Sequence, residues 1–543
     1  MGKEEIKLLL ARFSNLRNER SPLEKHWDDI ATLVLPLYGG TVGGLDQGSS
    51  KSGKLHDSTA PLALLKFISI LDGFLTPHGK RWHRLSAPNG EVSTSDDDRK
   101  KFTNIEDLLF KYRYNGDSNF SQQMGEAYAS LGAFGNTIMY VGSAKKGGIF
   151  YRTYSIKDCY VVMTPEDKLE TVFRTFKFSA TQAFSTWGNA VSEKIKNALA
   201  RSPEEKFEFL HVVTPNPNIK KSEGVEGKRY TSYYIEVQGE VVLEIGGYNV
   251  MPYAFGRYSV APNEVWGRGP GSLVFPDIRI INEMELISLK ASQKLLNPPL
   301  LASSILTVGK LKLTPGGVNY GSVDSNGRPL VTELGSKSQV ELSEHKLATK
   351  REVVKDAFLV KMFRMLEDLP QKTATEVFEI VREKGHLIGS VVYRLQGEFF
   401  SSLISREIDI LMNSGKLEDL PSSIEEEDGL LKISYENSIN RAVYNEDVTS
   451  FERVMTSVQL FLERDPDLAR IYDVEGIIRY LHKKHNVPVE FLKSKEVYSK
   501  EMEALGEQRE SQNALEQLRT VSEGVRNVGG AEGVDNLVKN VGS

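Results

Sequence analysis

Two glycine-rich segments resemble loops that bind phosphate groups. Residues 48–55 read GSSKSGKL, which has the G-x-x-x-x-G-K spacing of a loop that cradles nucleotide phosphates. Leu55, however, stands where a Ser or Thr hydroxyl must hold magnesium, and no strand pattern precedes the segment. Residues 267–272, GRGPGS, open a helix but lack the glycine spacing of a dinucleotide loop. The sequence therefore argues against nucleotide hydrolysis, and we interpret residues 267–272 as a flexible entry to the next helix.

Other reactive side chains are sparse and scattered. His482 and His485 lie three positions apart on a predicted helix, but no cysteine or paired carboxylate completes a metal site. No G-x-S-x-G or H-E-x-x-H motif stands out in the sequence. Cys159 is the single cysteine, so no internal disulfide can form, and we expect it to be a small buried side chain. We therefore predict a protein that is not an enzyme, with no catalytic residue, cofactor or metal.

A helix predicted over residues 341–363 and its C-terminal edge carry the cations with the clearest spacing. At about 100° per residue, four of them fall within a sector of roughly 60°: Lys346, Lys350, Lys361 and Arg364. Such a basic stripe suits contact with DNA phosphates, which is electrostatic and independent of base sequence. The same pattern also fits a solvated face or ion pairs to a neighbouring subunit. Lys372, a little further along the chain, is a fifth candidate for DNA contact.

Composition limits the classes of protein that fit. The 543 residues exceed what one compact core usually organises, so we expect several folding units. Hydrophobic residues make up 40% and charged residues 26%, as in ordinary folded proteins. No apolar run of about 18 residues predicts a membrane span. The formal net charge is −5, whereas a protein whose main task is gripping DNA is usually basic. Any DNA contact must then be local or weak.

Hydrophobic spacing separates a β-rich segment from several helical ones. Residues 136–260 are rich in Val, Ile, Tyr, Phe and Thr, which predicts strands and hairpins with a short helix at 181–200. Further on, helices over 276–296 and 341–363 flank a small β segment at 300–340. The predicted fold class is therefore α+β and mainly helical. Apolar residues at helical spacing predict the remaining helices over residues 3–35, 57–76, 97–113, 118–133, 374–412, 446–463, 473–485 and 494–522.

Several segments, taken in order, resemble the head-to-tail connector, or portal, family of short-tailed bacteriophages. The two longest near the N-terminus and the centre are LHDSTAPLALLKFISILDGFLTPHGKRWHRL (55–85) and WGRGPGSLVFPDIRIINEMELISLKASQKLLNPPLLA (266–302). LTPGGVNY (313–320) and KTATEVFEIVREKGHLIGSVVYRLQGEFFSSLISR (372–406) follow them. INRAVYNEDV and HNVPVEFLKSKEVY extend the likeness into the C-terminal part. No single segment is decisive, and the specificity lies in the ordered set, which spans most of the chain.

The resemblance implies a portal fold, with wing, stem, clip, tunnel-loop and crown regions in a dodecameric ring around a central channel. Paired helices around a small β insert fit the stem and clip, because about 20 helical residues span roughly 30 Å of a ring wall. On this mapping the stem helices are 271–296 and 341–363, the clip is 297–340 and the tunnel loop is 364–374. The other regions are the N-terminal wing 1–270, the long helix and wing return 375–439, the crown 440–522 and a flexible tail 523–543.

The resemblance also implies a function. The ring would sit at one capsid vertex of the virion, after assembly in the host cytoplasm, and double-stranded DNA of any sequence would be packaged and ejected through it. It would nucleate capsid assembly and dock the terminase motor and then the tail. Implied partners are further copies of the chain, major capsid and scaffolding proteins, the terminase large subunit, tail adaptor or tubular proteins and internal core proteins, with no membrane. The alternative is a tail adaptor or minor capsid protein without a role in DNA translocation.

Overall fold

The chain combines helices and sheets, with helix predominating, and this confirms the predicted α+β class. It divides into two compact units, Met1–Val443 and Tyr444–Ser543. In the part of the chain that is described, no helix has both the length and the apolar character that a membrane crossing needs. The computed structural model describes residues 3–36, 52–86, 96–144, 147–217, 219, 224–302, 312, 314, 316–320, 322–333, 340–361, 388–417, 432–435, 451, 453–459, 471–484, 492–493 and 495–527.

Four N-terminal helices lie within two residues of their predicted bounds. They are α1 (Lys3–Val34), α2 (Thr59–Leu75), α3 (Asp96–Tyr114) and α4 (Phe120–Phe134). The apolar face of α2, which includes Leu64 and Phe67, packs on α4, and Gly132 of α4 lets the two helices come close. The main hydrophobic core of the first unit is built around this pair.

The β-rich segment forms two antiparallel sheets. One has the strand order β4-β5-β6-β7-β8 and the other β3-β2-β9. The predicted helix at 181–200 is two helices, α5 (Ala180–Trp187) and α6 (Glu193–Arg201), because Gly188 adopts a φ of 57° between them. The strands are β2 (Asn136–Ser143), β3 (Ile149–Tyr154), β4 (Cys159–Met163), β5 (Leu169–Ser179), β6 (Lys206–Pro215), β7 (Tyr230–Glu236), β8 (Val241–Tyr248) and β9 (Tyr253–Arg257).

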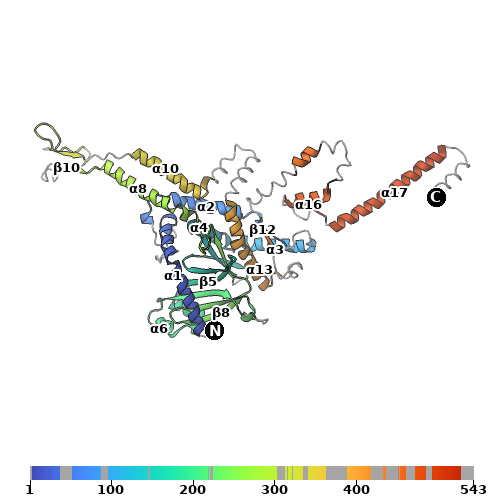
Figure 1. Ribbon diagram of the computed structural model, residues 1–543, viewed down its shortest axis with the longest axis horizontal. Helices are drawn as coiled ribbons and strands as arrows, with labels where there is room; N and C mark the ends of the chain where they lie inside the picture. Colours follow the sequence, from blue (N-terminus) through green and yellow to red (C-terminus); the bar gives the residue numbers. More distant parts are fainter. Residues whose placement is uncertain are drawn as a thin grey trace. The chain divides into compact units, whose positions relative to one another are not determined.

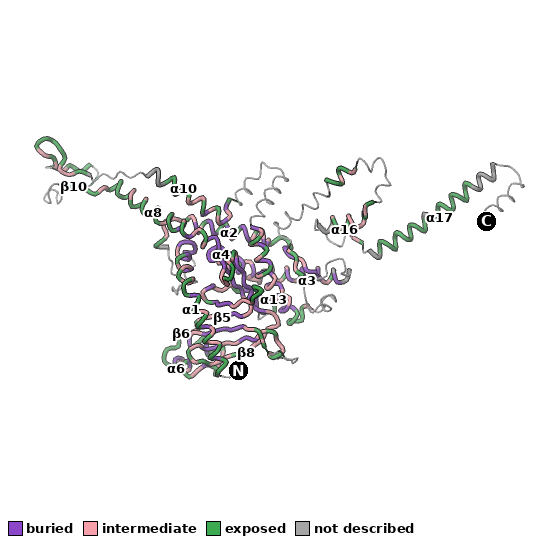
Figure 2. Tube along the Cα trace, in the orientation of Figure 1, coloured by how far each residue is buried: buried purple, intermediate pink, exposed green. Residues whose placement is uncertain are grey.

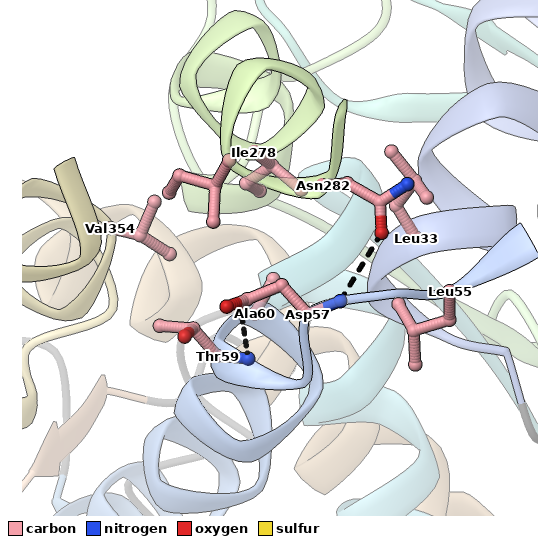
Figure 3. A pocket seen from close by; sticks show the side chains of 9 residues that line it. Leu33, Leu55, Asp57, Thr59, Ala60, Ile278, Asn282 and Val354 are labelled. Carbon is pink, nitrogen blue, oxygen red and sulfur yellow. Dashed lines mark hydrogen bonds between the residues drawn. The ribbon is translucent and has the colours of Figure 1, made fainter. Parts of the chain in front are cut away.

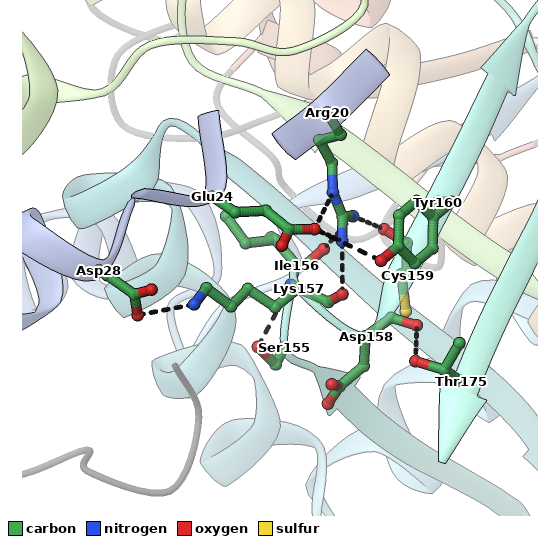
Figure 4. A network of polar contacts seen from close by, with 10 residues as sticks. All are labelled: Arg20, Glu24, Asp28, Ser155, Ile156, Lys157, Asp158, Cys159, Tyr160 and Thr175. Carbon is green, nitrogen blue, oxygen red and sulfur yellow. Dashed lines mark hydrogen bonds and ion pairs between the residues drawn. The ribbon is translucent and has the colours of Figure 1, made fainter. Parts of the chain in front are cut away.

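A buried arginine of α1 joins the helical layer to the sheets (Figure 4). Arg20 donates hydrogen bonds to the backbone oxygens of Ile156 at 2.8 Å and of Lys157 at 2.6 Å, in the turn that leads into β4. It also pairs with Glu24, and its guanidinium lies 3.5 Å from the ring centroid of Tyr160. The turn therefore has its carbonyl groups satisfied by a helix far away in sequence.

Later segments return to the same core. α13 (Ser401–Asn413) brings Glu407 against Arg113 of α3, and both side chains are fully buried. The Glu407 carboxylate also accepts a hydrogen bond of 2.6 Å from the hydroxyl of Tyr151. β12 (Lys432–Tyr435) pairs with β1 (His83–Ser86). The π-helical segment η5 (Gln396–Phe400) precedes α13, and the part of the predicted helix 374–412 before residue 388 lies outside the described residues.

Two long helices and a short antiparallel pair of strands form the segment that we call the arm. It comprises α8 (Phe275–Leu296), β10 (Leu300–Ala302), β11 (Val331–Glu333) and α10 (Val340–Ala357). α8 and α10 lie side by side, and β10 and β11 pair antiparallel beyond the end of α8 (Figure 1). We call the rest of the first unit the body. α10 ends earlier than the predicted residue 363, because Leu359 adopts a φ of 62°, which breaks the helical path.

The glycines of residues 267–272 do not provide the flexible entry that the sequence predicted. Gly267 and Gly269 pack directly on the backbone around Gly135, which follows α4. Gly271, in α7 (Pro270–Leu273), packs on the backbone of Ala133. A Cβ atom at any of the three positions would overlap main-chain atoms. The segment is a close contact between two stretches of backbone, and glycine is needed there for space.

Among the described residues of the second unit are the helices α16 and α17. α16 (Val474–Lys484) matches the predicted helix at 473–485, and α17 (Lys495–Asn527) extends the predicted 494–522 by five residues at its end. The predicted helix at 446–463 lies partly outside the described residues. Every described side chain in the outer part of α17, from residue 499 to 520, is exposed.

Candidate functional site

The arm is the candidate functional region, and its root is fixed to the body by a polar contact (Figure 3). The side-chain oxygen of Asn282 in α8 accepts hydrogen bonds from the backbone nitrogens of His56 at 2.7 Å and Asp57 at 3.3 Å. Its amide nitrogen donates to the backbone oxygen of Lys54 at 3.0 Å. One side chain of the arm thus satisfies three backbone groups of the segment before α2. Lys54, the lysine of the phosphate-loop-like sequence, takes part through its backbone.

Arg351 of α10 joins three parts of the chain at this root. Its Nε donates to Asp57 at 2.8 Å, and its Nη2 donates to Glu285 of α8 at 2.9 Å. Burial alone would raise the pKa of Asp57, but hydrogen bonds from Thr59 and Arg351 outweigh it and hold this pKa below its ordinary value. Asp57 is therefore a carboxylate that the arm itself stabilises. Apolar side chains complete the junction, among them Leu33, Ile278 and Val354.

Two lysines of the predicted basic stripe form ion pairs with carboxylates of the same chain. Lys350 pairs with Asp277 of α8 at 2.5 Å, and Lys361 pairs with Asp356. Lys361 also lies past the end of α10, so the helical projection that placed it beside Lys346 does not apply. Lys346 is exposed on α10 and has no ion-pair partner among the described residues. Arg364 and Lys372 lie outside the described residues.

The outer half of α8 carries two lysines that the sequence reasoning missed. Lys290 and Lys294 lie one turn apart and are exposed, and no carboxylate among the described side chains pairs with them. Together with Gln293, Leu296 and Asn297 they line an open groove. A signal was present in the sequence, because residues 286–297 contain two lysines and no acidic residue.

Burial changes sharply along α8. Its buried residues are Phe275, Ile278 and Ile281, all in the inner half, and no later residue of the helix is buried. Large apolar side chains nevertheless continue outward: Ile287 is 65% exposed and Leu296 is 87% exposed. Figure 2 shows this change from buried to exposed along α8. The outer arm therefore has the composition of a packed helix but finds no packing partner among the described residues.

Buried titratable groups in the body have structural roles. His211 lies between the two sheets and bonds to the hydroxyls of Tyr253 at 2.6 Å and Ser232 at 2.9 Å. Burial, aided by the charge of Arg174, lowers the pKa of His211 to about 3. Cys159 is buried, as expected, and burial raises the pKa of its thiol to about 12. In the described ranges, no group of three or more His, Cys, Asp or Glu side chains could hold a metal ion.

Comparisons with known proteins agree with the predicted resemblance. The family described as "Bacteriophage head to tail connecting protein" matches residues 7–492. The chain is 24% identical over 490 residues to the "Portal protein" of Salmonella phage epsilon15, covering 88% of this chain and 87% of that protein. It is also 24% identical over 432 residues to the "Probable portal protein" of Bordetella phage BPP-1, covering 78% of this chain and 77% of that protein.

Among solved structures, a chain described as "Virion of native gene transfer agent (GTA) particle" aligns with a TM-score of 0.34 and 12% identity, covering 79% of this chain and 95% of that chain. The identification rests on the family match, which spans most of the sequence in one continuous range. The predicted resemblance is confirmed, and the chain belongs to the bacteriophage head-to-tail connecting protein family.

Proposed function

We propose that this chain is a portal subunit, which forms a ring at one vertex of a phage capsid and lets double-stranded DNA pass through a central channel. The observation that carries the proposal is the family match over residues 7–492, together with two relatives named as portal proteins over most of their length. A tail adaptor or minor capsid protein is not favoured, since neither relative is named so. The ring has twelve copies, as the family resemblance implies.

The form of the arm supports this proposal. α8 and α10 run antiparallel and are held together by ion pairs, with Asp277 bound to Lys350 and Glu285 to Arg351. The β10–β11 pair links them beyond the end of α8. A subunit that crosses a ring wall and returns needs such a pair of struts, and the 22 residues of α8 are about 33 Å long. We assign α8 and α10 to the stem and the segment between them to the clip.

DNA contact belongs, in our proposal, to the exposed cations of the arm. Lys350 and Lys361 already have carboxylate partners in their own chain, so each offers little net positive charge. Lys290 and Lys294 have no such partner among the described side chains and lie on an open groove. A conduit for any DNA sequence needs weak phosphate contacts rather than base recognition. Arg364 and Lys372 stay candidates in the proposed tunnel loop.

The remaining roles follow from the same proposal. The ring is a non-catalytic component of the virion and is assembled in the host cell cytoplasm. It nucleates the capsid with scaffolding and major capsid proteins and holds the internal core proteins. Its clip docks the terminase large subunit during packaging and tail proteins afterwards. The segment between β10 and β11 offers exposed side chains for such docking, including Tyr320, which is 94% exposed.

The test is a mass measurement of the purified full-length chain, followed by a packaging assay. We expect a closed assembly of about twelve copies, and we expect Lys290→Gln/Lys294→Gln rings to assemble normally but to package or retain less DNA. A matched control is Lys194→Gln/Lys196→Gln, which removes two lysines from α6 in the body. A chain that stays monomeric under assembly conditions, or packaging that does not require it, would contradict the proposal.

A further inference from the structure

α8 carries two exposed apolar stripes, one on each side of the surface that faces α10. Asp277 and Glu285 both bind α10, so the line through them and Ile281 marks the side of α8 that faces α10. At about 100° per residue, Ile280 and Ile287 fall about 100–120° to one side of this line. Leu289 and Leu296 fall about 60–80° to the other side. All four side chains are exposed, by between 42% and 87%.

The ion pairs also fix which residues of α10 lie on each side. Lys350 binds Asp277, which lies on the same side of α8 as Ile280 and Ile287. At about 100° per residue along α10, Lys346 and Val353 fall on the same side as Lys350. We call these four residues the lysine flank: Ile280, Ile287, Lys346 and Val353. Arg351 binds Glu285, which lies toward the opposite side, and Glu344 falls there too. We call the second set the glutamate flank: Leu289, Leu296 and Glu344.

The two flanks are complementary in charge. Lys346 and Glu344 are both exposed, they lie at nearly the same level of α10, and neither has an ion-pair partner among the described residues. Each flank thus combines exposed aliphatic side chains with one unpaired charge, and the charges are opposite. Two different complementary surfaces on one chain produce a head-to-tail contact, which closes into a ring when the rotation between copies allows it.

We propose that the arms of adjacent copies pack flank to flank, the lysine flank of one copy on the glutamate flank of the next, with Lys346 paired to Glu344 of the neighbour. This inference rests on the proposed ring and gives it a specific interface. It assigns Lys346 to a subunit contact, whereas the sequence left DNA contact open for it. With both flanks covered, the side of α8 that bears Lys290 faces neither neighbour and is free to line the bore.

Cross-linking distinguishes this arrangement from others. Full-length variants Ile287→Cys, Leu289→Cys and the double variant are treated with a short bis-maleimide; Cys159 is 1% exposed and stays unreactive. Because the two positions lie on different flanks at a similar level, we expect the double variant to give a ladder of covalent multimers well beyond the dimer. Each single variant should give monomer alone. Dimers from Ile287→Cys alone would reveal a two-fold contact and overturn the proposal.

Charge exchange tests the Lys346–Glu344 pair. We expect Lys346→Glu to raise by roughly tenfold the subunit concentration below which rings dissociate, because it places two negative charges at the interface. Lys346→Glu/Glu344→Lys should restore most of the loss, since every interface then regains opposite charges. Lys194→Glu, in α6 of the body and on neither flank, is the matched control and should leave the rings intact.

The outcomes separate the interface from the proposed function. Rings that give no ladder with the double cysteine variant, and that tolerate Lys346→Glu, would overturn the interface and leave the portal assignment standing. A wild-type chain that forms no ring under any assembly condition would overturn both.

Discussion

The body and the outer arm differ in whether their charged and apolar side chains have partners among the described residues. In the body, Glu407 is fully buried and binds both Arg113 and Tyr151, so a costly charge has its partners in the same chain. In the outer arm, Ile287 and Leu296 are apolar yet exposed, and the exposed charge of Lys346 has no carboxylate among the described residues. The buried charges of the body thus have partners within the chain, whereas the outer arm has exposed apolar residues and an unpaired charge, as our proposal of a contact with another copy requires.

This difference predicts two kinds of mutational effect. Changes in the body should alter the stability of each subunit, because the interactions are within one chain. Changes on the outer arm should leave subunit stability almost unaffected and alter assembly instead.

Removing Glu407 should have the largest effect on the body. Glu407→Ala leaves Arg113 buried without a counter-charge, and we expect the free energy of unfolding to fall by about 3–5 kcal/mol. Urea unfolding followed by circular dichroism measures the loss. The double variant Arg113→Met/Glu407→Leu removes both charges and should recover a large part of it. A loss of less than about 1 kcal/mol in Glu407→Ala would show that the pair does not hold α3 to α13.

Equivalent truncations of apolar side chains should separate the two regions. Leu64 of α2 is 2% exposed, so Leu64→Ala should lower the free energy of unfolding by about 2–5 kcal/mol. Ile287→Ala in α8 should change it by less than about 0.5 kcal/mol in the dissociated subunit. Thermal unfolding of subunits at low concentration compares the two. Equal losses would mean that the arm packs within its own chain.

Acid should weaken the body through His211. Its pKa in the folded protein is about 3, because burial and the charge of Arg174 disfavour the protonated ring, whereas an unfolded histidine titrates near about 6.5. Between these pH values the unfolded chain binds a proton that the folded chain does not. The free energy of unfolding therefore falls as the pH drops through this window, by about 2 kcal/mol at pH 5.

The His211→Gln variant isolates this contribution. It should be less stable than the parent at pH 7, since the bonds to Tyr253 and Ser232 are altered, but its stability should decline less between pH 7 and pH 5. Urea titrations at both pH values give the slope. Parallel slopes in the parent and the variant would assign the acid sensitivity to other groups.

The root of the arm should show a smaller, local effect. Arg351→Ala removes the bonds to Asp57 and Glu285, which are partly exposed to solvent, so we expect a loss of about 1 kcal/mol confined to the arm. Hydrogen exchange should become faster in α10 and stay unchanged in α4. Lys355→Ala, which breaks a pair within α10 itself, is the matched control and should leave the root unaffected. Faster exchange throughout the body would contradict a local role.

Much of the fold could be predicted because it is encoded in local spacing. The apolar period of residues 3–34 and 275–296 identifies helices whichever partner they meet. The errors in the predicted helix bounds have one local cause. A positive φ at Gly188 and at Leu359 ends or splits a helix, and the periodicity around those positions does not report it.

The candidate site was harder to predict because it depends on residues far apart in sequence. A helical projection of α10 shows Lys350 as a free cation, yet Asp277 on α8 pairs with it. The glycines at 267–271 look flexible until the backbone around Gly135 is placed against them. Lys346 and Glu344 look like ordinary surface charges until α8 defines the two flanks. Each of these arrangements depends on contacts between segments far apart in sequence, which one-dimensional patterns do not contain.

The decisive measurement is electron microscopy of the assembled chain at a resolution that separates α8 from α10. We expect closed rings in which arms of adjacent copies touch along their flanks, with α8 beside an open bore. Particles without a bore, or rings held together by their bodies while the arms stand apart, would contradict this expectation.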